Sequence, residues 1–367
     1  MQGDARASAW IGLVARLPVL GICGVSGAGK TTLIEGLIPE LCAAGLRVTV
    51  VKHGARRVTV DRPGKDSERF FRAGAEVCLW GEERFCRCRG EEEFLPWLAR
   101  RARSCDILLV EGHAATPVPK LWLLGPGHQS PPPGAGTVLA VLSRDSAPAG
   151  VRTYIAQWLP RRWLDTPVWG CVLLGGRSRR MGRPKHLIRQ EGRTWLERGV
   201  ELLMPQVEQV VLSGAGELPA GLAGCPRVPD LPGEVQGPMA GLLALMRWNP
   251  WVSWLPLACD QPQASPEALA WLLAQRRPGV WGILPALGEG GWVEPLLAHY
   301  DFRLLPLLED LAASGSYRPG ALAGLPQVAS PVPPPPLRDA WRNINRPTEL
   351  PPALREDGVG DLPGGED

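Results

Sequence analysis

The first half of the chain alternates short apolar runs with stretches in which leucines recur at helical spacing. The apolar runs that predict buried strands are 19–23, 48–51, 77–80, 107–110, 121–124 and 138–142. Leu33, Leu37 and Leu41 lie on one face of a predicted helix over 31–44, which Gly45 should end. Strands that alternate with helices in this way predict βαβ units and a largely parallel sheet.

The same rhythm begins again after a pause at 146–167, where only a short closing helix near 153–159 is predicted. The buried strands predicted beyond it are 168–174, 210–213, 252–258 and 280–285. The segments with helical spacing are 194–204, 239–248, 266–276 and 303–313. Prolines at 331–336 predict an extended connector, and the acidic, glycine-rich residues after Leu354 predict a disordered tail.

This pattern predicts an α/β chain of two domains, each a largely parallel sheet flanked by helices. A length of 367 residues agrees with two cores, because domains of roughly 150–200 residues are typical. The expected parts are an N-terminal extension over 1–17, a first domain over 18–145, a linker over 146–167, a second domain over 168–350 and a tail over 351–367.

Composition narrows the class of protein. The net charge of +3 is too small to argue for nucleic acid as a partner, and no apolar run reaches the roughly 18 residues that span a bilayer. Nine cysteines form no paired framework, which suits reduced thiols in the cytoplasm. Cys78, Cys86 and Cys88 hint at zinc, but no second C-x-x-C or His-rich partner follows, so a metal site there is not favoured.

A phosphate-binding loop follows the first predicted strand. Residues 24–31 read GVSGAGKT, which matches the P-loop pattern G-x-x-x-x-G-K-[ST]. Its glycines let backbone N–H groups turn toward the phosphates, Lys30 reaches the β- and γ-oxygens, and Thr31 supplies a ligand for Mg²⁺. The nucleotide-binding residues expected here are Gly24, Gly27, Gly29, Lys30, Thr31 and Thr32.

A carboxylate for the same metal should end a neighbouring strand. Glu111 directly follows the apolar run 107–110 and is the candidate, because the carboxyl ends of parallel strands share one edge of the sheet. The alternative is an ordinary loop acid, since many strands end in one.

At these residues the first half resembles the molybdopterin-guanine dinucleotide biosynthesis adaptor family (MobB). The matching pieces are 24–32, Lys52-His53, 61–67, 73–75, 110–112 and Pro119-Lys120. The resemblance implies a P-loop NTPase-like fold and a GTP-binding protein that assists attachment of the nucleotide to the molybdenum cofactor. It also implies molybdopterin-delivering proteins and target molybdoenzymes as partners, and allows an oligomer through the P-loop domain.

A second glycine turn, crowded with cations, follows the strand predicted at 168–174. Leu174, Gly175 and Gly176 lead into a segment that holds Arg180 and Lys185. Glycines allow close approach of the backbone to phosphate, and the cations can neutralise a leaving pyrophosphate. A solvated basic loop is the alternative, but it would not explain a glycine pair directly after a buried strand.

Carboxylates and amides complete a nucleotidyl-transfer set. Asp260 ends the strand at 252–258 and is well placed to bind Mg²⁺ at the sheet edge. Asp230 precedes a Leu-Pro-Gly turn. Asn343 and Asn345 precede Pro347, where a simple turn is the alternative reading.

In their order along the chain, these pieces resemble the molybdenum cofactor guanylyltransferases (MobA) over 168–350. The resemblance implies a Rossmann-like nucleotidyltransferase that joins GTP and molybdopterin into molybdopterin-guanine dinucleotide and releases pyrophosphate. The site residues it implies are Arg180, Lys185 and Asp260 in catalysis, Leu174, Gly175, Gly176, Lys185, Asp230 and Asp260 around GTP, Asp260 on Mg²⁺, and Asn343 and Asn345 on the molybdopterin side.

The whole chain is thus expected to be a fusion of adaptor and guanylyltransferase. Pro184 stands where the family carries an acid before the lysine, so a cytidylyltransferase for the same cofactor, or a sugar-phosphate nucleotidyltransferase, stays open. The other alternative is a non-catalytic GTP switch fused to a molybdopterin carrier.

Overall fold

The computed structural model describes residues 2–52, 66–73, 76–80, 84–87, 93–127, 130–174, 181, 184–230, 233, 235, 237–288 and 292–350. The chain divides into two compact units, 1–162 and 163–367. Among the described residues, no helix combines the length and the apolar character needed to cross a membrane. The tail predicted after Leu354 and the glycine pair at Gly175 and Gly176 lie outside the described residues.

The first unit is built on a five-stranded parallel sheet of order β2-β5-β1-β6-β7. The strands are β1 (Val19–Gly24), β2 (Val48–Lys52), β5 (Ile107–Glu111), β6 (Lys120–Leu123) and β7 (Val138–Leu142). These are the strands that the apolar runs predicted, apart from the run at 77–80. The central position of β1 puts the loop that follows it between the ends of β5 and β6.

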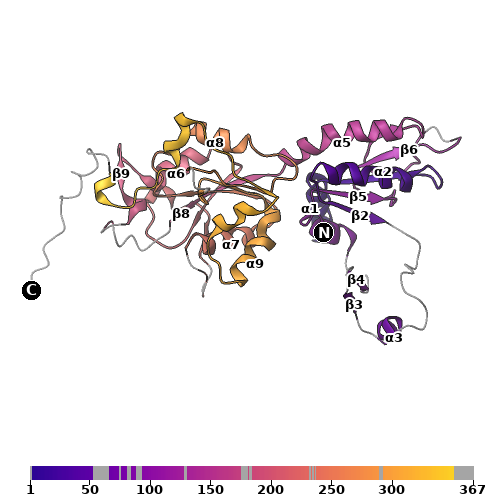
Figure 1. The fold of residues 1–367 in the computed structure, drawn as a ribbon, viewed down its shortest axis with the longest axis horizontal. Helices are drawn as coiled ribbons and strands as arrows, with labels where there is room; N and C mark the ends of the chain where they lie inside the picture. The colour runs from indigo at the N-terminus through magenta and orange to yellow at the C-terminus, as the bar shows by residue number, and fades with distance from the viewer. Residues whose placement is uncertain are drawn as a thin grey trace, which may run out of the picture. The chain divides into compact units, whose positions relative to one another are not determined.

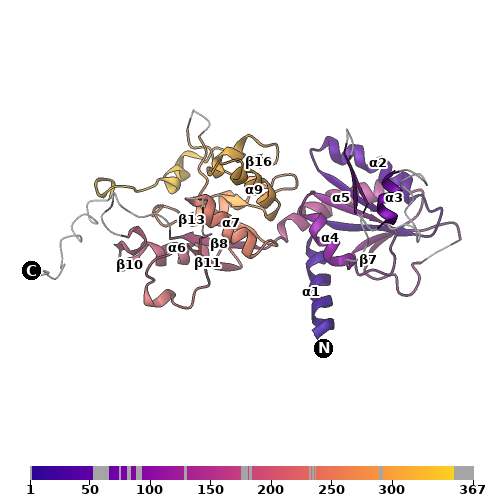
Figure 2. The ribbon, with the colours of Figure 1, turned by 90° about the horizontal axis from the view of Figure 1, so that it is seen from below.

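Helices cover the sheet of the first unit on both faces. Apolar residues of α2 (Lys30–Ala43) and α5 (Ala147–Leu164) pack together with those of β1, β5 and β6 (Figure 1). On the other face α4 (Phe94–Ala102) packs against β5, and α1 (Gln2–Arg16) packs against α4 (Figure 2). Gly45 adopts a φ of 79° just past α2, so the predicted stop is confirmed.

Several elements of this unit differ from the prediction. The run at 77–80 is β3 (Val77–Trp80), which pairs antiparallel with β4 (Arg84–Arg87) in a separate two-stranded sheet. The chain between them is too short for the crossover that a parallel partner requires, so the prediction that this run joins the parallel sheet was wrong. α1 was not predicted, and α5 is much longer than the short helix expected near 153–159. A further short helix is α3 (Asp66–Arg72).

The second unit holds a seven-stranded sheet of order β12-β11-β8-β13-β15-β14-β16. The strands are β8 (Val168–Leu173), β11 (Gln209–Ser213), β12 (Arg227–Val228), β13 (Ser253–Ala258), β14 (Gly282–Ile283), β15 (His299–Tyr300) and β16 (Val328–Ala329). β15 runs antiparallel to β13 and to β14, so the sheet is mixed. β15 was missed because two residues are too few to show a strand period. A small hairpin joins β9 (Arg189–Gln190) to β10 (Arg193–Thr194).

Two pairs of helices cover this sheet. α7 (Pro238–Trp248) and α9 (Leu305–Ala313) pack on one face, and α6 (Trp195–Leu203) and α8 (Pro266–Leu273) on the other, as Figure 1 shows. Thr194 and Glu197 form a capping box at the start of α6. The 3-10 helices are Lys185–Leu187, Ala220–Leu222, Phe302–Leu304, Pro319–Gly324, Pro335–Trp341 and Pro347–Glu349.

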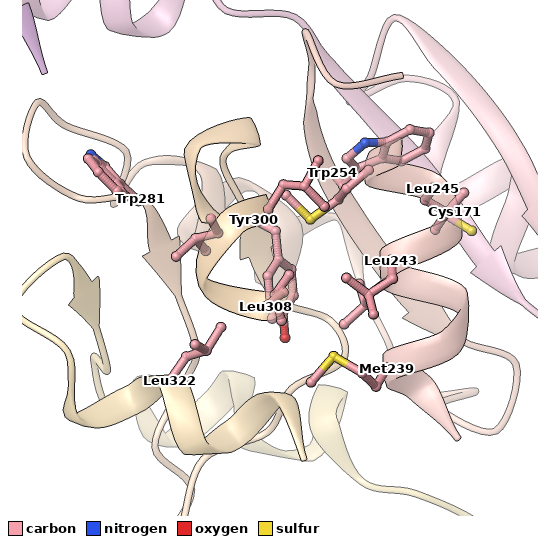
Figure 3. Close-up of a cluster of buried hydrophobic side chains, with 14 of the residues drawn as sticks. Cys171, Met239, Leu243, Leu245, Trp254, Trp281, Tyr300, Leu308 and Leu322 are labelled. Atoms are coloured by element: carbon pink, nitrogen blue, oxygen red, sulfur yellow. The ribbon is translucent and has the colours of Figure 1, made fainter. Parts of the chain in front are cut away.

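The core beneath α7 and α9 is large and aromatic. Figure 3 shows Trp254 and Tyr300 from neighbouring strands packed with Leu243 of α7 and Leu308 of α9. Trp163, at the end of α5, is 1% exposed and belongs to the same core. The guanidinium of Arg303 lies 4.2 Å from its ring centroid.

Trp163→Ala is expected to destabilise the second unit by about 3–5 kcal/mol, because a buried tryptophan leaves both a cavity and lost apolar contacts. Leu164→Ala is the matched control, since the neighbouring Leu164 is 55% exposed. Chemical denaturation of both variants measures the difference. Equal midpoints for the two would show that Trp163 contributes little to this core.

Candidate functional site

The sheet of the second unit has a point where its strand order reverses. The chain runs from β8 outward to β11 and β12, and then returns to place β13 on the other side of β8. Ligands of open α/β sheets bind outside the carboxyl ends of the strands at such a point. Leu174 directly follows β8, and Asp260 follows β13, so both lie at this position.

Lys185 links three segments of the chain at this point. Its Nζ donates to Oδ2 of Asp260 at 2.7 Å and to Oδ1 of Asn345 at 2.8 Å. The side chains of Lys185 and Asp260 are 11% and 21% exposed, so the ion pair is largely shielded yet open to a ligand. Residues separated by 75 and 160 positions therefore meet in one cluster.

The backbone of the 343–345 segment is held in place next to Asp260. The N–H of Ile344 donates to the carbonyl of Asp260 at 2.9 Å. The carboxylate of Glu349 accepts from the N–H groups of Asn345 and Arg346. An apolar cluster anchors the same region; its members are Met181, Ile188, Trp195, Ile344 and Leu350.

A buried carboxyl group lies behind this cluster. Glu294 is 3% exposed, and its Oε2 accepts from Nδ2 of Asn343 at 3.2 Å. Burial, with a smaller contribution from the charge of Asp260, raises the pKa of Glu294 to about 7. The structure therefore joins both predicted asparagines to acidic or cationic side chains of the site.

Asp230 lies on the other side of the strand reversal, beyond the end of β12. It is exposed, and a Cβ at Gly241 would come within 3.6 Å of its Oδ1 and 3.1 Å of Oγ of Ser213. The tightest contact of such a Cβ would be with Cδ2 of Leu173, at 2.8 Å, so glycine at 241 lets α7 pack closely on β8 beside Asp230. Gly175, Gly176 and Arg180 lie outside the described residues, and their roles stay predictions.

The P-loop of the first unit has the backbone that its glycines require. Gly24 and Gly29 adopt φ values of 149° and 86°, and a Cβ at Gly24 would lie 2.3 Å from the carbonyl oxygen of Leu123. The Nζ of Lys30 donates to the carbonyls of Gly24 and Val25 at the rim of the loop.

Thr31 and Glu111 meet across the sheet edge. The hydroxyl of Thr31 donates to Oε1 of Glu111 at 2.6 Å, and Nζ of Lys52 lies 3.4 Å from Oε2. A hydroxyl beside a carboxylate is the ligand set that Mg²⁺ takes beside nucleotide phosphates. The two predicted metal ligands of this unit are therefore in hydrogen-bond contact.

A buried lysine supports the loop after Glu111. Lys120 is 0% exposed, and its ammonium donates to the carbonyls of Ala114 and Thr116. Burial lowers the pKa of Lys120. This contact ties the strand end that carries Glu111 to β6.

Metal ligands do not gather elsewhere in the part of the chain that the structure describes. No group of three or more His, Cys, Asp or Glu side chains there could hold a metal ion. The Sγ atoms of Cys78 and Cys86 lie 2.8 Å apart across the β3–β4 pair, and Cys88 lies outside the described residues. A site with one carboxylate still fits Mg²⁺, which commonly binds through one or two carboxylates plus substrate phosphates.

Two residues of these clusters received no role from the sequence. Glu294 could have been noticed as a lone acid within an apolar stretch, which indicates a buried carboxyl group. Lys52 directly follows a predicted strand, by the same argument that selected Glu111.

Comparisons with known proteins match the two sheets separately. Residues 19–144 match the family model described as molybdopterin guanine dinucleotide synthesis protein B. Residues 170–323 match that of the MobA-like NTP transferase domain.

Three curated relatives show the same division. The molybdopterin-guanine dinucleotide biosynthesis adapter protein of Haemophilus influenzae is 43% identical over 29% of this chain and 64% of its own length. The molybdenum cofactor biosynthesis bifunctional protein of Synechocystis sp. is 34% identical over 42% of this chain and 45% of its own length. The molybdenum cofactor guanylyltransferase of Rhodobacter capsulatus is 34% identical over 49% of this chain and 92% of its own length. The chain spans less than two thirds of the first two relatives' own length.

Proposed function

We propose that this protein transfers GMP from GTP to molybdopterin, because the chain belongs to the molybdenum cofactor guanylyltransferase family and carries a MobB domain before the transferase domain. The products are molybdopterin-guanine dinucleotide and pyrophosphate. The observation that carries the proposal is the Lys185–Asp260–Asn345 cluster at the strand reversal, which joins a cation for phosphate to a carboxylate for metal.

In the proposed reaction, a phosphate oxygen of molybdopterin attacks the α-phosphorus of GTP in line. The bond from the α-phosphorus to the bridging oxygen breaks, and the electron pair leaves with pyrophosphate. Lys185, together with Arg180, would neutralise the charge that develops on the leaving group. Asp260 would hold Mg²⁺, which supplies charge neutralisation on the phosphate oxygens when bound.

The strand order suggests how the two substrates divide the site. Leu174 and Asp230 follow strands on the β8 and β12 side, which would receive GTP. Asn343 and Glu294 belong to the side of β13 and β15, which would receive molybdopterin. Asp260 follows β13, the strand of that side that pairs with β8, and would contact the reacting phosphates of both substrates.

Nucleotide selectivity tests this function against its rivals. Thermal shift with GTP, CTP and ATP in the presence of Mg²⁺, followed by product analysis with molybdopterin, separates a guanylyltransferase from a cytidylyltransferase. Stabilisation by GTP together with molybdopterin-guanine dinucleotide as the product supports the proposal. Binding of GTP and molybdopterin without any pyrophosphate release would instead identify a carrier.

Lys185→Ala is expected to lower kcat by about 30- to 300-fold, because a charge-assisted contact that strengthens in the transition state is lost. Arg198→Ala is the matched control, since Arg198 pairs with Glu191 on the surface of α6. Steady-state kinetics with GTP as the varied substrate measures both variants. A raised KM with unchanged kcat would assign Lys185 to ground-state binding alone.

The first unit is proposed to bind GTP at the P-loop, with Mg²⁺ on Thr31 and Glu111. It is also proposed to assist the transferase by proximity, because the two units are joined in one chain. Molybdopterin-delivering proteins and target molybdoenzymes are proposed partners, and oligomers would form through this unit. A cytoplasmic location is proposed as well, since nine cysteines scattered along the sequence without a paired framework suit a reducing compartment.

A further inference from the structure

The carboxylate of Glu294 is held by a contact on each of its oxygens. Oε1 accepts from the N–H of Leu296 at 3.3 Å, and Oε2 accepts from Nδ2 of Asn343 at 3.2 Å. The group is 3% exposed, so solvent cannot take the place of either partner. Its backbone N–H donates to the carbonyl of Pro285, which fixes the segment from the other side.

These contacts determine which way the amide of Asn343 points. Because Nδ2 faces Glu294, the carbonyl oxygen Oδ1 is turned the other way. No donor among the described residues reaches this Oδ1, although Asn343 is half-buried and lies two positions from Asn345. An oriented acceptor without a protein partner is thus presented beside the Lys185–Asp260–Asn345 cluster.

We propose that Glu294 is a positioning residue that fixes Asn343 with its carbonyl oxygen toward the acceptor substrate, so that this side of the site selects a ring N–H donor. The pyrimidine edge of a pterin presents such donors. This inference rests on the proposed function, because it takes molybdopterin to bind on the β13 and β15 side. It adds the residue that determines whether that side of the site offers the ligand a hydrogen-bond acceptor or a donor.

Protonation of Glu294 should turn the amide of Asn343, so that this side of the site offers a donor in place of an acceptor. With its pKa raised to about 7, Glu294 is ionised above that pH and accepts from Asn343. Below it, Oε2 carries a proton and donates to Oδ1 of Asn343, so the amide turns and offers Nδ2 to the ligand. Binding of molybdopterin should therefore weaken as the pH falls through about 7.

The other ionisable groups around Glu294 do not control the orientation of the Asn343 amide. Asp260 raises the pKa of Glu294 through its charge, but Oδ2 of Asp260 is engaged by Lys185. The hydroxyl of Tyr300 donates to the carbonyl of Pro295 at 2.7 Å, and its pKa is raised by burial, so it stays neutral. Glu294 is the titrating group that contacts Asn343 among the described residues.

Glu294→Gln reproduces the protonated state at every pH. The N–H of Leu296 requires an acceptor, so the glutamine oxygen takes the place of Oε1 and Nε2 faces Asn343. The amide of Asn343 must then turn to accept. Glu309→Gln is the matched control, because Glu309 pairs with Arg247 on the surface.

Equilibrium binding of molybdopterin, followed by pterin fluorescence between pH 6 and 8, tests the proposal without any need for transfer. Glu294→Gln is expected to raise the Kd about tenfold at pH 8, the loss of roughly one hydrogen bond, and to remove the change of Kd centred near pH 7. The phosphate of molybdopterin, with a second pKa of about 6, should affect wild type and variant alike. The Kd of GTP at the transferase unit should stay within about twofold of the wild-type value. Glu309→Gln should bind both substrates as wild type does. An unchanged molybdopterin Kd at pH 8, or a Kd of GTP that rises equally, would overturn the proposal.

A second measurement guards against a merely structural effect. In protein labelled with ¹⁵N-asparagine, the side-chain signal of Asn343, assigned through Asn343→Ser, should titrate near pH 7 in wild type and not in Glu294→Gln. A flat signal in wild type would contradict the coupling. A wild-type chain that binds molybdopterin with this pH dependence but releases no pyrophosphate would refute the proposed function and leave this inference standing.

Discussion

Asp260→Asn is expected to abolish guanylyl transfer, with a loss of about 10³-fold or more in kcat. The carboxylate is the proposed ligand for Mg²⁺, and a neutral amide is a much weaker ligand for that ion. The same change removes the charge that holds Lys185 at 2.7 Å, so the cation loses its position as well. Both contributions act on the developing charge of the pyrophosphate.

The fold should survive this substitution. Asparagine has the same shape, and the contact from the N–H of Ile344 uses the backbone carbonyl of residue 260. Asp310→Asn, on the exposed side of α9, is the matched control. Pyrophosphate release and molybdopterin-guanine dinucleotide formation are measured together with the thermal midpoint. Release at close to the wild-type rate would refute the assignment of Asp260.

Lys30→Ala is expected to remove GTP binding at the P-loop, by about 100-fold or more, while transfer continues in the second unit. Lys30 donates to the carbonyls of Gly24 and Val25, so its ammonium is already at the loop where the β- and γ-phosphates would lie. The transferase unit is proposed to bind its own triphosphate beside Lys185 and Asp260, which are in hydrogen-bond contact. Loss of the adapter's help should reduce the transfer rate but not end it.

Two-site titration with a fluorescent GTP analogue distinguishes the units. Lys30→Ala should lose one class of site and Asp260→Asn should alter the other, while only Asp260→Asn abolishes product. If Lys30→Ala is as inactive as Asp260→Asn, the P-loop is the catalytic site and the roles of the two units are reversed.

Much of this architecture could be predicted from local sequence. The glycines of the P-loop, the strand before it and the helix after it are neighbours along the chain, so their geometry follows from short-range backbone preferences. The parallel sheet of the first unit follows from the alternation of strands and helices. Where that rhythm breaks, at β3 and β4 and at the two-residue strands β12, β15 and β16, local pattern predicted the pairing wrongly or missed the strand.

Sequence by itself thus determined the two α/β units, the P-loop and the candidate residues of the transferase. Only the tertiary structure decided that Lys185 joins Asp260 to Asn345, and that Glu294 orients Asn343. These contacts join residues 49 to 160 positions apart, and they depend on the order of β8, β13 and β15 in the sheet. Strand order and burial arise from packing of the whole unit, which no local run of residues specifies.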